Sequence, residues 1–318
     1  MQLSILIVNW NTGEQLRDCL FSIAKYSAGQ VSKVVVVDNA SNDGSARDLE
    51  LFNIPLEVIR NSKNLGFARA CNQGAAVCDS RYLLFLNPDT RIFKNSLDVP
   101  IAYMEEECNS DVGICSIQLV DEKGVVSKTC SRFPTLPRIF SRAVGLNKLP
   151  GQSGLAMLME DWAHDSDQVV DQVIGAFFFT RRDVFEVLKG FDERFFVYYE
   201  EVDYSYRAME QGWRTVFLSG AQAFHLGGGS SSKVKAKRLF YSLRSRLLYG
   251  FKHFPFWHAW LHLLLTLLIE PITRSFSSLL WGGVKNLSNN LVAYGMLYRD
   301  IPNILSKSFK NKTNHLIP

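Results

Sequence analysis

Three carboxylate side chains, those of Glu200, Glu201 and Asp203, fall within four positions of an aromatic segment. Carboxylates this close repel one another, and burial among aromatic rings makes their charged forms still more costly. Such a group binds a cation or keeps the pKa of at least one carboxyl raised. The alternative is the solvated acidic start of a helix, because residues 202–209 have helical spacing. The aromatic surroundings favour the first interpretation.

Asp38 directly follows the apolar run Val31–Val37 and opens the motif DNASNDG. An Asp at the end of a buried strand can accept hydrogen bonds from a ribose or a base. The same residue types also form ordinary turns, so both interpretations stay open at this point.

Residues 64–74 read NLGFARACNQG. A glycine turn that opens a helix presents free backbone N–H groups to phosphate, and Arg69 would project from the first turn of that helix. The sequence has no GxxxxGK(S/T) motif, which excludes a P-loop.

Asp89 ends the run Asn87-Pro88-Asp89 directly after the apolar segment Tyr82–Leu86. A carboxylate at the end of a strand is a good ligand for a hard cation, although these residues are also common in turns. His225 stands just before a glycine- and serine-rich run at 227–232. It would join a metal site only if the fold brings it beside Asp89, and otherwise is a structural histidine.

Elements of an α/β fold must position these residues. Apolar runs predict strands at 3–8, 31–37, 56–60, 82–86, 175–180 and 216–218, while helical spacing predicts helices at 14–26, 68–77, 182–188 and 202–209. Strands that alternate with helices imply a mostly parallel sheet covered on both faces, with ligands beyond the carboxyl ends of the strands. Residues 111–180 show less regular patterning.

Charge is distributed unevenly along the 318 residues. Residues 1–210 carry 21 Lys and Arg against 29 Asp and Glu, whereas residues 211–318 carry 14 against 2. The basic C-terminal part therefore meets something anionic, either nucleic acid or a membrane surface. The six cysteines form no CxxC pair and no zinc spacing, which favours a reducing compartment, and no signal peptide opens the chain.

An apolar run at 254–269 decides between these two partners. At 16 residues it is shorter than the roughly 20 that a spanning helix needs, and we expect Glu270-Pro271 to end it. Seven basic residues precede it, namely Lys233, Lys235, Lys237, Arg238, Arg244, Arg246 and Lys252. Lipid suits this combination better than a phosphate groove does, so we expect interfacial attachment to an anionic membrane and no nucleic acid. The alternative is a helix buried in the core.

Taken together, the motifs resemble the family 2 glycosyltransferases with a GT-A fold, and most of all the bacterial rhamnosyltransferases of cell-wall and O-antigen assembly. The resemblance covers about residues 3–232. It implies a GT-A domain at 1–232, with a nucleotide-sugar half at 1–110 and an acceptor half at 111–232, followed by a basic helical region at 233–318. It also implies a place at the cytoplasmic face of the bacterial inner membrane.

The resemblance implies roles for individual residues. Donor-binding residues would be Asn9, Asn11, Asp38, Asn64, Gly66, Arg69, Asn72 and Asn87. Asp89 and His225 would hold Mg²⁺ or Mn²⁺, although only the last carboxylate of the family's DxD motif is present. Glu201 would be the general base, where the family usually has Asp, and Glu200 and Asp203 would serve the acceptor.

The implied reaction is an inverting transfer of a sugar from a nucleotide sugar, with dTDP-rhamnose as the expected donor, to a polyprenyl-diphosphate-linked or polysaccharide acceptor. Other nucleotide-sugar donors and a non-catalytic nucleotide-sugar-binding scaffold are the alternatives. A dinucleotide-dependent oxidoreductase would also use a parallel sheet, but the first strand lacks GxGxxG.

Overall fold

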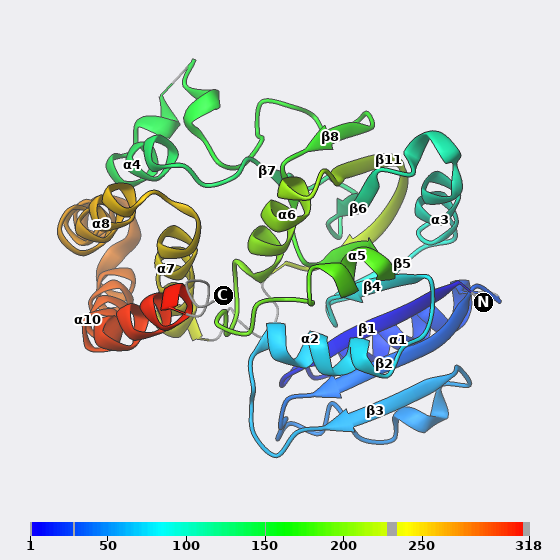
Figure 1. Cartoon of the computed structure of the whole chain (residues 1–318). Coiled ribbons are helices and arrows are strands. Elements are labelled where there is room, and N and C mark those ends of the chain that lie inside the picture. Colours follow the sequence, from blue (N-terminus) through cyan, green and yellow to red (C-terminus); the bar gives the residue numbers. More distant parts are fainter. Residues whose placement is uncertain (1, 28, 150, 228–233, 314–318) are drawn as a thin grey trace. The chain divides into compact units, whose positions relative to one another are not determined.

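The computed structural model describes residues 2–27, 29–149, 151–227 and 234–313. The chain forms two compact units (Figure 1). The first contains Met1–Phe133, Leu158–Glu193 and Glu200–Ser230, and the second contains Pro134–Met157, Arg194–Tyr199 and Ser231–Pro318. The predicted domain boundary after residue 232 lies outside the described residues.

A nine-stranded sheet forms the first unit, in the order β3-β2-β1-β4-β10-β6-β11-β5, with β8 also paired to β11. The strands are β1 (Leu3–Asn9), β2 (Val31–Asp38), β3 (Leu56–Arg60), β4 (Tyr82–Leu86), β5 (Thr90–Ile92), β6 (Val112–Val120), β8 (Gln168–Val170), β10 (Phe177–Arg181) and β11 (Arg214–His225). The strands from β3 to β4 are parallel, and β10 runs antiparallel between β4 and β6. A short pair, β7 (Cys130–Ser131) and β9 (Gln172–Val173), lies apart from this sheet.

Helices cover both faces of this sheet, because alternate residues of each strand point to opposite sides. Leu3, Ile5 and Ile7 pack into one core with α1 (Gln15–Tyr26), and Leu6 and Val8 pack into another with α2 (Phe67–Ala76). Further helices are α3 (Asp98–Glu105), α5 (Arg182–Val187) and α6 (Glu200–Glu210). The predicted α/β class with a mostly parallel sheet is confirmed.

The structure extends the predictions for the later strands at two places. The region 111–180 contains β6, a fully buried strand whose polar residues have internal partners: Oγ of Ser116 donates to the carbonyl of Phe177, and Nε2 of Gln118 donates to the carbonyl of His164. The predicted short strand 216–218 is part of β11, which continues to His225 past a register shift between Leu218 and Gln222. A bulge there hid the continuation from the sequence pattern.

The second unit is helical among its described residues. It contains α4 (Leu136–Val144), α7 (Lys235–His253), α8 (Phe256–Leu264), a π-helical turn at Leu265–Ile269, α9 (Glu270–Ser277), a second π-helical turn at Ser278–Gly282, and α10 (Gly283–Thr313). Short 3-10 turns complete the chain at Leu49–Leu51, Glu107–Asn109, Leu146–Lys148 and Ser153–Leu155.

Glu270-Pro271 does not end the apolar helix as expected, because the helix continues from Phe256 to Trp281. Pro271 has no N–H to donate to the carbonyl of Leu267, one turn earlier. The hydroxyl of Tyr298 donates to that carbonyl instead, at 2.6 Å, and the π-helical turn before Glu270 gives the local change in winding.

Candidate active site

The carboxyl ends of β1 and β2 bring Asn9 and Asp38 together. Nδ2 of Asn9 donates to Oδ1 of Asp38 at 2.9 Å, and both residues are buried. Oδ1 of Asn9 accepts from the hydroxyl of Thr12, so the Asn9 amide is used inside the fold. Asn9 therefore orients the Asp38 carboxylate instead of presenting its own polar atoms to solvent.

Asn11 connects the loops that follow these two strands. Its backbone N–H donates to Oγ of Ser41 at 3.0 Å, and its Oδ1 accepts from the backbone N–H of Asn42 at 2.8 Å. Asn11 has a φ of 53°, a left-handed conformation that asparagine tolerates better than most residues. The Asp38 loop is thus held in one shape by residues from both strands.

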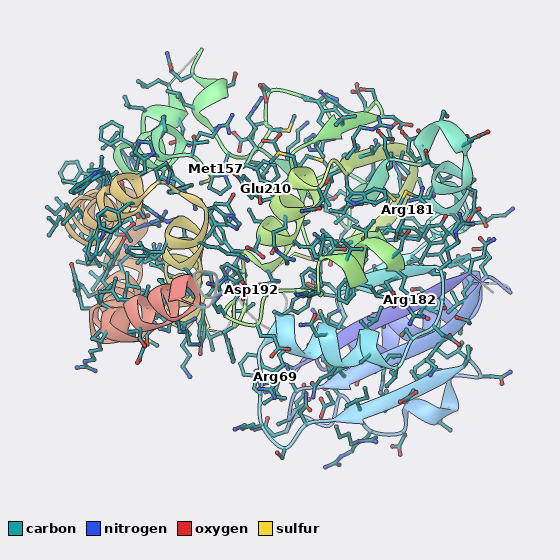
Figure 2. All side chains as sticks on the ribbon, in the orientation of Figure 1. Arg69, Met157, Arg181, Arg182, Asp192 and Glu210 are labelled. Carbon is teal, nitrogen blue, oxygen red and sulfur yellow. The ribbon has the colours of Figure 1, made fainter. Side chains whose placement is uncertain are left out.

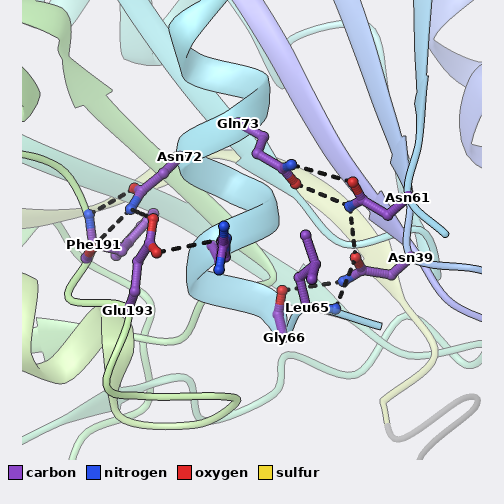
Figure 3. A network of polar contacts seen from close by, with 9 residues as sticks. Asn39, Asn61, Leu65, Gly66, Asn72, Gln73, Phe191 and Glu193 are labelled. Atoms are coloured by element: carbon purple, nitrogen blue, oxygen red, sulfur yellow. Dashed lines mark hydrogen bonds and ion pairs between the residues drawn. The ribbon is translucent and has the colours of Figure 1, made fainter. Parts of the chain in front are cut away.

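A chain of side-chain amides fixes the turn before α2 (Figure 3). Nδ2 of Asn39 donates to the carbonyl of Gly66 at 3.1 Å, and Nδ2 of Asn61 donates to Oδ1 of Asn39 at 2.9 Å. Oδ1 of Asn64 accepts from the N–H of Gly66, whose φ of 91° favours glycine. Gln73 completes the chain by exchanging hydrogen bonds with Asn61. The role of Asn39, Asn61 and Gln73 in this turn was not predicted from the sequence, because their pairing depends on the fold.

Arg69 and Asn72 project from α2 toward the segment after α5. Nδ2 of Asn72 donates to the carbonyl of Phe191 and its Oδ1 accepts from the N–H of the same residue, both at 2.9 Å (Figure 3). A Cβ at Gly190 would lie 2.6 Å from Oδ1 of Asn72, so only glycine fits there. Nε of Arg69 lies 3.7 Å from Oε2 of Glu193, with both side chains about half exposed. This loose contact leaves the Arg69 guanidinium available to a ligand.

The same edge of the sheet carries these groups, as Figure 2 shows for Arg69 and Asp192. Arg181 and Arg182 lie toward the opposite end of the strands, where Arg181 pairs with Tyr82 at the start of β4 (Figure 2). Arg181 is buried and donates to the carbonyls of Val112, Met104 and Asn109, so its role is structural.

Asp89 and His225 meet across the pairing of β5 with β11. Nε2 of His225 lies 3.4 Å from Oδ1 of Asp89, and both side chains are largely buried, with 13% and 10% exposed. The N–H of Leu226 also donates to the carbonyl of Asp89 at 3.2 Å. The fold therefore brings His225 beside Asp89, which was the condition for His225 to join a metal site. The continuation of β11 places His225 there.

Asn87 holds the turn that presents Asp89. Its N–H donates to the carbonyl of Ala176, and its carbonyl accepts from the N–H of Thr90, both at 3.0 Å. Its side chain is partly exposed beside that turn. Across the described ranges, no group of three or more His, Cys, Asp and Glu side chains could hold a metal. The Asp89–His225 pair offers one carboxylate and one imidazole side by side in this part of the structure.

The carboxylates of the acidic segment have different environments at the start of α6. Glu200 is buried, and its pKa is raised well above the usual value by burial and then by the charge of Glu201. Oε2 of Glu200 has no hydrogen-bond partner among the residues the structure describes. The same two glutamates raise the pKa of Cys71, after burial, which places them beside α2. Tyr198 and Tyr199, directly before the helix, both have left-handed φ angles, of 66° and 72°.

Asp203 is fully buried and forms an ion pair with Arg207, whose Nε donates to Oδ2 at 2.8 Å. Arg207 also donates to the carbonyls of Leu188 and Gly190. Asp203 therefore orients a guanidinium that holds the turn after α5, next to the glycine that Asn72 requires.

Known proteins resemble this chain in sequence. Residues 4–189 match the family model described as glycosyl transferase family 2. The chain is 24% identical over 269 residues to N-acetylglucosaminyl-diphospho-decaprenol L-rhamnosyltransferase of Mycobacterium tuberculosis, covering 81% of this chain and 87% of the relative. It is 29% identical over 175 residues to rhamnosyltransferase WbbL of Escherichia coli, covering 54% of this chain and 62% of that protein.

Solved structures show the same fold. The mannosyltransferase PcManGT from Pyrobaculum calidifontis, in complex with GDP-Man and Mn²⁺, aligns with a TM-score of 0.56 at 13% identity, over 96% of this chain and 83% of that one. TarS of S. aureus in complex with UDP-GlcNAc aligns with a TM-score of 0.55 at 17% identity, over 93% and 80%. The GT-A architecture expected from the sequence motifs is confirmed.

Proposed function

Because the chain belongs to glycosyl transferase family 2, we propose that it transfers L-rhamnose from dTDP-rhamnose, with inversion, to a hydroxyl group of a lipid-linked or polysaccharide acceptor. The observation that carries the proposal is that Asp38, Arg69 and the Asp89–His225 pair lie at the carboxyl ends of parallel strands of one sheet or in the segments that follow those ends. Ligands of open α/β sheets bind beyond the carboxyl ends of the strands, which is where these residues stand.

The donor would lie along this edge. Asp38, oriented by Asn9, would accept hydrogen bonds from the nucleoside, and Asn11 would shape the loop beside it. Asn64 and Gly66 form the turn that opens α2, and the first backbone N–H groups of that helix would face the diphosphate, with Arg69 as its cation. Asn72 and Asn87 would lie beside the sugar of the donor.

Asp89 and His225 are the residues that would hold Mg²⁺ or Mn²⁺ together with the donor diphosphate. When bound, the cation would supply positive charge where the nucleoside diphosphate leaves. The largely buried position of both ligands strengthens such an interaction, since opposite unit charges about 4 Å apart gain about 4 kcal/mol at an effective dielectric of 20. Arg69 would add to the same stabilisation.

Glu201 would accept the proton of the acceptor hydroxyl as that oxygen attacks the anomeric carbon from the face opposite the leaving group. Burial and then the charge of Glu201 raise the pKa of Glu200, which favours a proton on Glu200 and leaves Glu201 as the proposed base. Glu200 would then donate a hydrogen bond toward the acceptor. Asp203 would support the acceptor side by holding Arg207 and the turn at 188–190.

The sugar and acceptor follow from the names of the relatives. Both curated relatives reported above are rhamnosyltransferases, and one acts on an N-acetylglucosaminyl-diphospho-decaprenol acceptor by its name. A polyprenyl-diphosphate-linked acceptor belongs to a membrane. We therefore place the enzyme at the cytoplasmic face of the bacterial inner membrane, in cell-wall or O-antigen assembly.

An exposed apolar face on the second unit supports attachment to that membrane. We define the apolar face by its exposed side chains, Trp257, Leu261, Leu264, Leu268, Ile272, Phe276, Leu279, Leu280 and Trp281. These positions recur at helical spacing along one side of the helix, while Ala259, His262, Thr266 and Glu270 are buried on the other. The helix 256–281 is long and apolar enough to cross a membrane, but only 22% of its most apolar window is buried. This small buried share argues against a core helix, and the buried polar side chains of His262, Thr266 and Glu270 on the other side support an interfacial helix over a spanning one.

The exposed basic residues Lys235, Lys237 and Arg238 add attraction to anionic lipid. Arg244 and Arg246 do not contribute as expected, because both are buried in ion pairs, with Asp300 and Glu270 respectively. Lys233 lies outside the described residues.

The test is to incubate the full chain with Mg²⁺, a lipid-linked N-acetylglucosaminyl diphosphate acceptor, and dTDP-rhamnose, UDP-GlcNAc or GDP-mannose in parallel. We expect transfer from dTDP-rhamnose, and nuclear magnetic resonance of the product should show an anomeric configuration opposite to that of the donor. Transfer from one of the other donors alone would reassign the sugar. Retention of configuration would contradict the mechanism.

A further inference from the structure

A cluster of arginine side chains surrounds one buried glutamate in the second unit. Glu270 of α9 pairs with Arg246 of α7 and with Arg274 one turn further along α9, whose Nε donates to Oε1 at 2.8 Å. These two guanidinium groups lower the pKa of Glu270 to about 2, against the effect of burial. Glu270 therefore stays ionised and balances one of the two positive charges.

A third cation, Arg142 of α4, joins the cluster. The hydroxyl of Thr273 donates to the carbonyl of Ala143 at 2.6 Å, which ties the residue before Arg274 to the residue after Arg142. Protein packed around the Arg142 guanidinium lowers its pKa, and so do the charges of Arg246 and Arg274. Within the described part of the chain, Arg142 makes no hydrogen bond or ion pair, and its side chain retains exposed surface. Three arginines thus face one carboxylate, an excess of two positive charges.

Polar atoms inside the cluster also lack partners. Nε of Arg246 and both ring nitrogens of His262 are buried without a hydrogen-bond partner among the described residues. Burial and then the charge of Arg246 lower the pKa of His262 to about 3, so His262 is neutral at pH 7 and adds no further charge. Buried donors that lack acceptors are costly, and an anion would satisfy them.

Resting on the proposed function, we infer that the cluster of Arg142, Arg246 and Arg274 binds the diphosphate of the lipid-linked acceptor. A diphosphate esterified at both ends carries two negative charges, which match the excess. Guanidinium groups bind phosphate oxygens through paired N–H donors.

The position of the cluster favours a lipid over a soluble anion. Arg274 and Glu270 lie on the same continuous helix as the apolar face. The apolar face of this helix would contact the lipid tail, and the arginine cluster would contact the charged head. Tyr199 belongs to the same unit as the cluster and directly precedes Glu200 in the chain.

The direct test titrates geranyl diphosphate into the full chain in detergent and measures binding by calorimetry. Arg142→Gln should weaken binding about tenfold or more, and Arg142→Lys, which keeps the charge, should recover part of the loss. The matched control Arg299→Gln removes an exposed charge from α10 of the same unit and should change the affinity less than about twofold. Unchanged binding by Arg142→Gln, or equal losses in the control, would overturn the inference.

Inorganic pyrophosphate and dTDP serve as the soluble competitors. If either binds the cluster as tightly as geranyl diphosphate and loses affinity equally in Arg142→Gln, the cluster is a soluble-anion site and the lipid assignment is overturned. Thermal unfolding of each variant checks that it is folded.

A kinetic arm separates this inference from the proposed function. With the lipid-linked acceptor, Arg142→Gln should raise the acceptor KM about tenfold and leave the donor KM unchanged. With a phosphate-free glycoside acceptor, the acceptor KM of Arg142→Gln should equal that of the unsubstituted chain. Absence of transfer by the unsubstituted chain would contradict the proposed function, and the binding measurement would still decide the inference. Transfer with unaltered acceptor KM in Arg142→Gln would overturn the inference alone.

Discussion

Nε2 of His225 lies 3.4 Å from Oδ1 of Asp89, although the two residues are far apart in the sequence. The contact exists because β11 continues past its bulge and pairs with β5, which places His225 opposite Thr90. In the proposed function, this imidazole and this carboxylate, both largely buried, would hold a divalent cation together with the phosphates of the substrate.

The first prediction is that turnover depends on this pair and on a divalent cation. Asp89→Ala and His225→Ala should each lower kcat at least about 100-fold, because either change removes half of the protein's ligands to the cation. EDTA should abolish transfer, and Mg²⁺ or Mn²⁺ should restore it. The control is Asp79→Ala, an exposed carboxylate that should leave kcat unchanged. Full activity in excess EDTA would show that no cation is needed.

The second prediction distinguishes the adjacent glutamates. Glu201→Gln keeps the shape and removes the proton acceptor, so kcat should fall about 100-fold or more while the donor KM changes little. Glu200→Gln should be the milder change, because burial and the charge of Glu201 already favour the protonated, uncharged form of Glu200. Steady-state kinetics of the two variants make the comparison. A larger loss in Glu200→Gln would exchange the two roles.

The third prediction concerns stability and pH. The folded-state pKa of Glu200 is raised, so the folded chain binds this proton more tightly than the unfolded chain does. The resulting stabilisation is fully present below the unfolded pKa of about 4.3 and is lost as the pH rises through the folded pKa. The slope is at most about 1.4 kcal/mol per pH unit for one group. Urea unfolding across this range should show a smaller decline for Glu200→Gln, and an identical decline in both proteins would contradict the assignment.

The fourth prediction compares two ion pairs with the same spacing. Asp203 is fully buried against Arg207, whereas Glu186 pairs with Arg182 at 2.7 Å on the surface. Asp203→Ala would leave Arg207 without its carboxylate and loosen the turn at 188–190, so the free energy of unfolding should fall by about 3 kcal/mol. Glu186→Ala should cost less than about 0.5 kcal/mol. Chemical denaturation measures both, and equal costs would show that burial does not set the value of the Asp203 pair.

The sequence predicted the parallel half of the sheet well, because β1, β2 and β4 are apolar runs that end at polar motifs. Asp38 and Asp89 could be located for the same reason, since they follow such runs. The bulge in β11 and the hydroxyl of Tyr298 that supports Pro271 could not be predicted. Both depend on partners distant in the sequence, as does the Asn39–Asn61–Gln73 network, and local periodicity carries no information about them.

The last prediction concerns the membrane. Trp257 and Trp281 are the most exposed large side chains of the apolar face, at 78% and 81%. If this face lies in the lipid interface, replacing both by Ser removes two large apolar anchors, and sedimentation with anionic liposomes should fall severalfold. High salt should weaken binding by the unsubstituted chain only in part, because ions screen Lys235, Lys237 and Arg238 but not apolar contacts. The control is Leu51→Ser, because Leu51 is an equally exposed apolar residue of the first unit, at 80%. This variant should sediment with the liposomes as much as the unsubstituted chain does. Equal sedimentation of all three proteins would exclude this face as the attachment.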